Sequence, residues 1–268
     1  MTLSPTTLTR KNLYFLVFIS GMTCLGLEMA ASRLLGNIFG SSNLVWASII
    51  GLILIYLTVG YFLGGKLADR HPEPALFTKI LIIAGFSGVI IPVIAQPILR
   101  FAADAFDQLN LGILAGSFVS VLILMLVPMI LLGTASPFAI RLAVEDTSSA
   151  GQAAGKVYAI STLGSFIGTF LPSLILIPLI GTYRTFVTFG IVLILVSLIF
   201  LIRIQGLKKS VIFIFLFIIS VVLLILGPRG AIKSTIGQVY EGESAYNYIQ
   251  VLEQDGYFML RLNEGQGV

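Results

Sequence analysis

The chain has 268 residues, of which 57% are hydrophobic and only 10% are charged. Water-soluble domains carry roughly 25% charged residues and about 45–50% apolar ones. This composition therefore excludes an ordinary soluble fold and indicates an integral membrane protein, with the lipid bilayer as its first partner. The net charge of +4 fits Lys and Arg in loops at a membrane surface. It is not evidence for nucleic-acid binding, and we expect no nucleic-acid partner.

Seven apolar runs are long enough to cross the bilayer, which takes about 20 residues of helix. They cover residues 12–32, 43–65, 76–98, 112–134, 157–181, 183–202 and 210–227. The sequence therefore predicts an all-α integral membrane helix bundle with about seven transmembrane helices. This multi-pass transmembrane domain is expected to occupy residues 1–230.

The positions of Lys and Arg predict the orientation, because cytoplasmic loops carry an excess of both. If the N-terminus lies inside the cell, ten of these residues fall in inner segments and five in outer ones. We therefore expect a cell (inner or plasma) membrane protein whose N-terminus is cytoplasmic. Seven crossings then place the C-terminal tail outside the cell. If one run rich in Gly and Pro re-enters the membrane instead of crossing it, the tail moves to the cytoplasm.

Residues 231–268 have a different composition and predict a soluble β-hairpin. The segment from Tyr246 to Glu253 alternates with the period of a strand. Asp255-Gly256 supplies a tight turn, and a second strand follows with Phe258, Leu260 and Leu262 on one face. An isolated hairpin is only marginally stable in water. We therefore expect this tail to begin a larger domain or to dock on a partner.

Two charged residues fall within the first apolar run or close to its end. Glu28 lies inside the run, where an ionised carboxylate costs several kcal/mol unless it is paired, protonated or hydrated. Arg33 follows five residues later and is an available partner. The pair has two interpretations: a substrate or proton site, or an interfacial ion pair whose side chains reach toward the membrane surface.

A glycine-rich motif, Gly64-Gly65-Lys66-Leu67-Ala68-Asp69-Arg70, follows the second run. Gly65 allows close helix packing, Asp69 can cap the next helix or pair with an arginine, and Arg70 adds a positive charge. The motif resembles the loop between the second and third helices of major facilitator transporters. Farther along, Gly164 and Gly168 form a G-x-x-x-G pair that predicts close helix packing. Three prolines predict bends in the spans, at 128, 172 and 178.

The chain offers no evident catalytic residues. With one histidine, His71, and one cysteine, Cys24, in an apolar run, no Ser/His/Asp, Cys/His or histidine-rich metal constellation can form. The sequence has no phosphate-binding P-loop and no dinucleotide fingerprint after a strand. We therefore predict no catalytic residues, no metal site and no cofactor in this chain.

Several segments in their order resemble the membrane domain of spermidine-synthase-like fusion proteins. In that family a helix bundle precedes a polyamine aminopropyltransferase domain. The likeness covers nearly the whole chain and rests on Leu27–Leu35 with Phe39–Ser42, Gly64–Arg70, Leu132–Pro137 with Arg141, and Gly155–Gly164 with Ile177–Gly181.

The tail resembles the first strands of an aminopropyltransferase, which implies substrate-facing roles for Tyr246, Asn247 and Gln266. Asn247 and Asn263 depart from the glutamine and aspartate of the family's motifs, which weighs against polyamine binding. The family's Rossmann-like domain binds decarboxylated S-adenosylmethionine and carries the catalytic acids. It has no counterpart in residues 1–268, so none of its residues is carried over and we expect no transferase activity.

Three functions remain open. The first is the non-catalytic membrane region of a spermidine-synthase-like protein, anchoring or docking a synthase-like domain or partner. The second is a small facilitator-like transporter of polyamines or other cations, suggested by Glu28 and the Gly64–Arg70 motif. The third is a structural subunit of a larger membrane complex, whose partner is another membrane subunit or a second copy of the chain.

Overall fold

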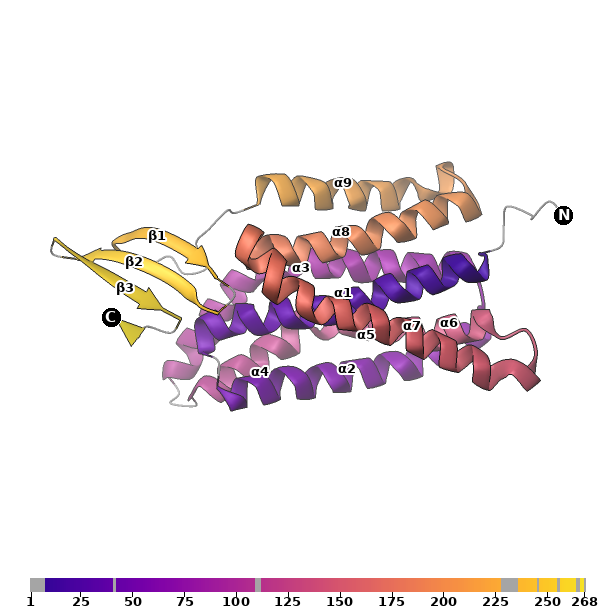
Figure 1. The fold of residues 1–268 in the computed structure, drawn as a ribbon, viewed down its shortest axis with the longest axis horizontal. Helices are drawn as coiled ribbons and strands as arrows, with labels where there is room; N and C mark the ends of the chain where they lie inside the picture. Colours follow the sequence, from indigo (N-terminus) through magenta and orange to yellow (C-terminus); the bar gives the residue numbers. More distant parts are fainter. Residues whose placement is uncertain are drawn as a thin grey trace.

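The fold was analysed in a computed structural model of the chain (Figure 1). The structure describes residues 8–40, 42–108, 112–227, 236–244, 246–254, 256–263 and 266–267. Helices run roughly parallel to one long axis, and a small β-sheet caps one end of the bundle (Figure 1). We call this the sheet end; the first helix begins at the opposite end, called here the N-terminal end.

Three long helices open the chain: α1 (Arg10–Phe39), α2 (Asn43–Arg70) and α3 (Pro74–Gln108). The 30 residues of α1 span about 45 Å at 1.5 Å per residue, enough to cross the hydrocarbon of a bilayer. The side chains of Thr9 and Ser42 accept hydrogen bonds from backbone N–H groups in the first turns of α1 and α2. The Gly64–Arg70 motif lies in the last two turns of α2, so its interpretation as a loop is wrong.

The fourth apolar run forms three helical pieces: α4 (Gly112–Leu124), α5 (Leu126–Gly133) and α6 (Ala135–Ala143). The breaks fall where proline removes a backbone donor. Pro128 and Pro137 cannot donate to the carbonyls four residues earlier, at the ends of α4 and α5. The helical path therefore extends nine residues past the expected end at residue 134.

A kinked path leads from α7 (Ala150–Leu171) through a π-helical turn (Pro172–Leu176) into α8 (Ile177–Gln205). Within α8, Gly181 has φ 80° and ψ 167°, which interrupts the helix. The boundary expected between residues 181 and 183 coincides with this break. In Figure 1, α7 runs toward the sheet end and α8 runs away from it. The last helix, α9 (Val211–Leu226), returns to the sheet end.

The main helix contacts pair α1 with α7 and α3 with α8. The G-x-x-x-G prediction is confirmed at the first of these pairs. A Cβ atom on Gly164 or Gly168 would collide with the carbonyl oxygen of Phe18 or Met22 on α1. Close backbone approach of this kind is how small residues hold membrane helices together.

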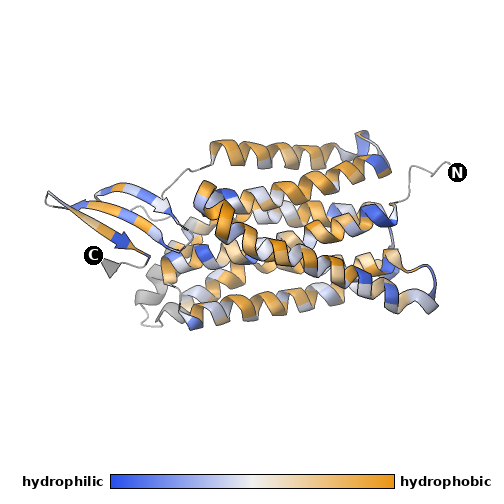
Figure 2. Cartoon of the chain, in the orientation of Figure 1, coloured by the Kyte–Doolittle hydropathy of each residue, from blue (hydrophilic) through white to orange (hydrophobic). Residues whose placement is uncertain are grey.

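The described residues contain six helical segments long and apolar enough to span a membrane. One of them, Ala150–Gln205, is 56 residues long and includes the break at Gly181. Apolar residues cover the middle of the bundle, and hydrophilic residues gather toward its two ends (Figure 2). The prediction of a multi-pass helical membrane protein is thereby supported.

The C-terminal sheet is an antiparallel meander of β1 (Gln238–Glu243), β2 (Tyr248–Gln254), β3 (Tyr257–Leu262) and β4 (Gln266–Gly267). The hairpin expected from the sequence is β2–β3, paired from Ile249↔Leu262 to Gln254↔Tyr257. Gly256 in its turn has φ +81°, whereas Asp255 lies outside the described residues. Strands β1 and β4 were not expected.

Candidate functional site at the junction of bundle and sheet

The carboxylate of Glu243, the last residue of β1, is bound by residues from two helices. Its Oε1 accepts hydrogen bonds from Asn37 Nδ2 at 3.1 Å and from the Thr182 hydroxyl at 2.6 Å. Its Oε2 accepts one from the Thr182 backbone N–H at 2.5 Å. We call Glu243, Asn37, Thr182 and Arg33 the junction cluster. Three of its members belong to the bundle and one to the sheet.

The backbone break at Gly181 explains why Thr182 can bind a carboxylate. The helix restarts after the break, so the first N–H groups of the new segment lack partners within the helix. The partial positive charge at such an end favours a carboxylate. Glu243 thus caps the second part of α8 although it lies 61 residues further along the chain.

Arg33 joins the cluster from α1. Its Nε lies 3.7 Å from Glu243 Oε1, an ion-pair distance too long for a hydrogen bond. Its two terminal nitrogens donate to the carbonyl oxygens of Ser244 at 2.6 Å and Tyr246 at 3.0 Å. The side chains of Arg33 and Glu243 are only 16% and 8% exposed. Each charge therefore depends on the other for compensation.

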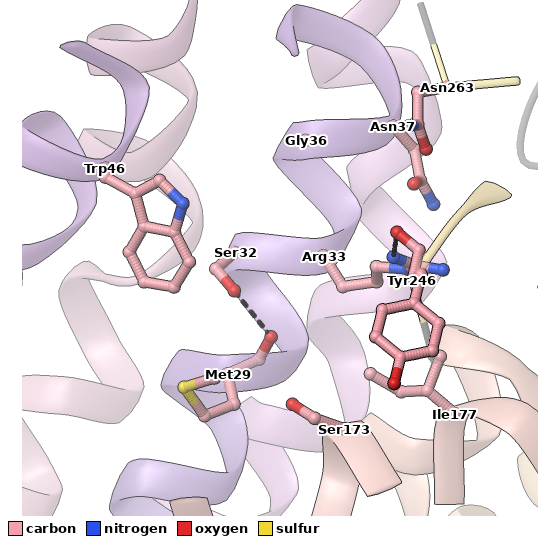
Figure 3. A pocket seen from close by; sticks show the side chains of 10 residues that line it. All are labelled: Met29, Ser32, Arg33, Gly36, Asn37, Trp46, Ser173, Ile177, Tyr246 and Asn263. Carbon is pink, nitrogen blue, oxygen red and sulfur yellow. Dashed lines mark hydrogen bonds between the residues drawn. The ribbon is translucent and has the colours of Figure 1, made fainter. Parts of the chain in front are cut away.

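A cavity of about 200 Å³ adjoins the junction cluster. Arg33 and Asn37 form part of its wall; in Figure 3, Trp46 of α2 lies on the side of Ser32, whereas Arg33 points the other way, toward Tyr246. Ser173 and Ile177 contribute from the π-helical turn and the start of α8. Tyr246 and Asn263 of the C-terminal region close the remaining side. The remaining lining residues are Met29, Ser32 and Gly36.

The three tail residues with predicted substrate-facing roles have different positions relative to the cavity. Tyr246 lines the cavity, and its carbonyl oxygen binds Arg33. The side chain of Asn247 accepts a hydrogen bond from Asn263, and its carbonyl oxygen binds Ser244, so it holds a local turn. Gln266 belongs to β4, and its side chain lies outside the described residues.

The proposed pairing of Glu28 with Arg33 is wrong, because Arg33 binds the tail instead. Glu28 is half-buried in α1, and no hydrogen bond or ion pair reaches it from the described part of the chain. It lies four residues before Ser32, and residues at this spacing share a helix face. Glu28 itself does not line the cavity, but it directly precedes Met29, which does.

The N-terminal end of the bundle carries two more ion pairs. Asp69 lies 3.4 Å from Arg141, as the sequence allowed, and this contact joins two of the segments that carry the family resemblance. Arg10 lies 2.6 Å from Glu145. All four side chains are about half or more exposed, so solvent screens both pairs and neither defines a site. The close packing predicted for Gly65 is wrong, because nothing lies within 4 Å of a Cβ at that position. Arg70 ends α2 and has no ion pair in the described residues.

Sequence reasoning missed Glu243, Asn37, Thr182 and Trp46. Asn37 could have been found, because it follows Arg33 by four residues on one helix face. Gly181-Thr182 also has the residue types of a helix end followed by a new helix start, with Gly after the first helix and Thr at the beginning of the next. Glu243 had no such signal, because its partners lie 61 and 206 residues away.

The fold and this junction define a polytopic helical membrane protein with a β-sheet fixed to one end of its bundle. Comparison with family models, with curated proteins and with solved structures gives no match to this chain.

Proposed function

We propose that the chain is a membrane-embedded platform that holds its C-terminal sheet, and whatever domain or partner that sheet joins, in a fixed place at one end of the bundle. The observation that carries this proposal is the buried carboxylate of Glu243, bound by three bundle residues. If the sheet were only linked to the bundle by a flexible segment, Glu243 would be exposed to water and would not require hydrogen bonds from the bundle. By the resemblance described above, the docked partner is a synthase-like domain.

Platform function is also supported by the exposed apolar surface of the sheet. On one face of the sheet, Tyr240 of β1 and Phe258 and Leu260 of β3 are 57%, 70% and 39% exposed. Apolar residues gathered on one surface are typical of contact sites for other protein segments. We therefore infer that the sheet continues into, or receives, a further protein layer.

We further infer that the bundle crosses the membrane seven times. The break at Gly181 divides the 56-residue apolar segment into two passes of opposite direction. The start of α1 and the sheet lie at opposite ends of the bundle (Figure 1), as an odd number of crossings requires.

The platform is tested by Glu243→Ala. Removing one partner of a buried ion pair costs about 3–5 kcal/mol, because the other charge stays buried without compensation. We expect the sheet to separate from the bundle. Spin labels at Leu44→Cys and Tyr257→Cys, in a Cys24→Ser background, would report this as a broadened distance distribution by pulsed electron paramagnetic resonance.

The matched control is Glu253→Ala. Glu253 is an exposed carboxylate on β2, and it should leave the narrow wild-type distribution unchanged. If Glu243→Ala also leaves the distribution narrow, the sheet is held by other contacts and the platform proposal fails.

A second candidate is a carrier of small cations, favoured by the half-buried Glu28. An intramembrane carboxylate is by default a candidate functional group, and the described residues supply no ion-pair partner for Glu28. Proteoliposomes would take up a small cation, such as radiolabelled methylammonium, and Glu28→Gln would abolish that uptake. Equal uptake by wild type, Glu28→Gln and empty vesicles would eliminate this candidate.

A further inference from the structure

Among the described residues, all donors that bind the Glu243 carboxylate belong to the bundle, whereas the carboxylate belongs to the sheet. Asn37 and Arg33 come from α1, and Thr182 comes from α8. The two oxygens are bound separately, with Thr182 N–H on Oε2 and the other donors on Oε1. This arrangement matches a planar group with two oxygens, so the bundle itself contains a carboxylate receptor.

Part of the receptor borders the cavity, although Thr182 is not among the lining residues. Arg33 and Asn37 contact Glu243 and also line the 200 Å³ space beside it (Figure 3). Within the described residues, the side chains of Trp46 and Ser173 make no hydrogen bond, so the indole N–H and the hydroxyl are free to contact a ligand. Sites for drug-sized molecules measure about 300–1,000 Å³, so a smaller molecule fits here.

The same contacts that bind a carboxylate also hold the sheet. Each polar partner of Arg33 named above comes from the tail: the Glu243 carboxylate and the carbonyl oxygens of Ser244 and Tyr246. A carboxylate that reaches Arg33 from the cavity therefore competes with the tail. Two ligands that compete for one receptor exclude each other, so occupancy by one releases the other.

We propose that the cavity binds a small organic carboxylate, which takes the place of Glu243 on Arg33, Asn37 and Thr182 and thereby releases the sheet from the bundle. This inference rests on the proposed function, because it requires that the junction cluster holds the sheet. The sheet carboxylate is then a tethered competitor of the free ligand.

Trp46 provides the measurement, because it is the single tryptophan of the chain and lines the cavity. Its fluorescence would be followed while sodium propionate replaces sodium chloride at constant ionic strength and pH 7. In Glu243→Ala the tethered competitor is gone, so we expect a saturable change with an apparent affinity at least about tenfold higher than in wild type. Glu253→Ala should match wild type.

Three further titrations test the chemistry. In the Glu243→Ala background, Arg33→Gln should abolish the propionate response, and inorganic phosphate should not reproduce it. In wild type with spin labels on bundle and sheet, high propionate should broaden the distance distribution as Glu243→Ala does. A response that survives Arg33→Gln, or that phosphate produces equally, overturns the proposal.

The failures of the two proposals are distinguishable. If Glu243→Ala releases the sheet but propionate gives no saturable change in Trp46 fluorescence, the carboxylate site is disproved and the platform stands. If Glu243→Ala does not release the sheet, the platform fails, and the release mechanism fails with it.

Discussion

Gly168 shows how a single residue sets the distance between two membrane helices. A Cβ atom at this position would overlap the backbone carbonyl of Met22, which cannot move aside as a flexible side chain would. Gly164 meets Phe18 in the same way one turn earlier. The two glycines thus bring α7 against α1, the helix that carries Arg33 and Asn37 of the junction cluster.

We predict that Gly168→Ala lowers the free energy of unfolding by about 1–3 kcal/mol, the usual cost of overpacking a tight contact. Denaturation in mild detergent would measure the change. Gly155→Ala is the control on the same helix, because nothing lies within 4 Å of a Cβ at that position. It should be neutral or stabilise by up to about 1 kcal/mol through helix propensity. Equal effects of the two substitutions would contradict the packing role.

At the scale of elements, the break in α8 exposes the backbone N–H group of Thr182 that binds Glu243 in the junction cluster. Gly181 has φ 80° and ψ 167°, a region almost closed to other residues, and a Cβ there would lie 3.3 Å from Glu243 Oε2. Gly206 ends the same helix at φ 84° and ψ 164°, with nothing within 4 Å of a Cβ. The two glycines share a backbone conformation that would strain any other residue, but only Gly181 is close to the sheet.

We predict that Gly181→Ala and Gly206→Ala each destabilise the protein by about 1–3 kcal/mol, because each forces alanine into a strained conformation. Only Gly181→Ala should also loosen the sheet, because it disturbs the helix end that Glu243 caps. Limited proteolysis of the tail would separate the two effects. If both variants expose the tail to protease equally, general destabilisation explains the result and the capping role is refuted.

Elements were predictable from sequence where a local pattern specifies them. The hairpin β2–β3 follows from strand alternation and a Gly256 turn, and the long apolar runs specify α1, α2 and α3. The edge strand β4 has only two residues, too few to show a pattern. The partner of Arg33 was not predictable, because Glu243 comes near it only when the sheet docks on the folded bundle.

At the scale of the whole molecule, charge and apolar surface are separated along the long axis. The middle of the bundle is apolar and its ends are hydrophilic (Figure 2). The turn after α8 lies at the N-terminal end (Figure 1) and carries Lys208 and Lys209. Cytoplasmic loops are enriched in Lys and Arg. We therefore expect the N-terminal end to face the cytoplasm and the sheet to face the opposite side.

Single cysteines in a Cys24→Ser background test this topology with a membrane-impermeant maleimide. Leu207→Cys lies in the turn after α8 and Tyr257→Cys lies on the sheet; the native side chains are 61% and 79% exposed. In intact cells we expect labelling at Tyr257→Cys alone, with Leu207→Cys labelled only after permeabilisation, because α9 lies between the two sites and the proposed seven crossings place the sheet outside. Labelling of Leu207→Cys alone in intact cells would mean that an earlier apolar run, such as the one that ends at the break at Gly181, enters and leaves the membrane on the same face. The sheet and the N-terminus would then share a compartment, and any partner docked on the sheet would have to be sought there.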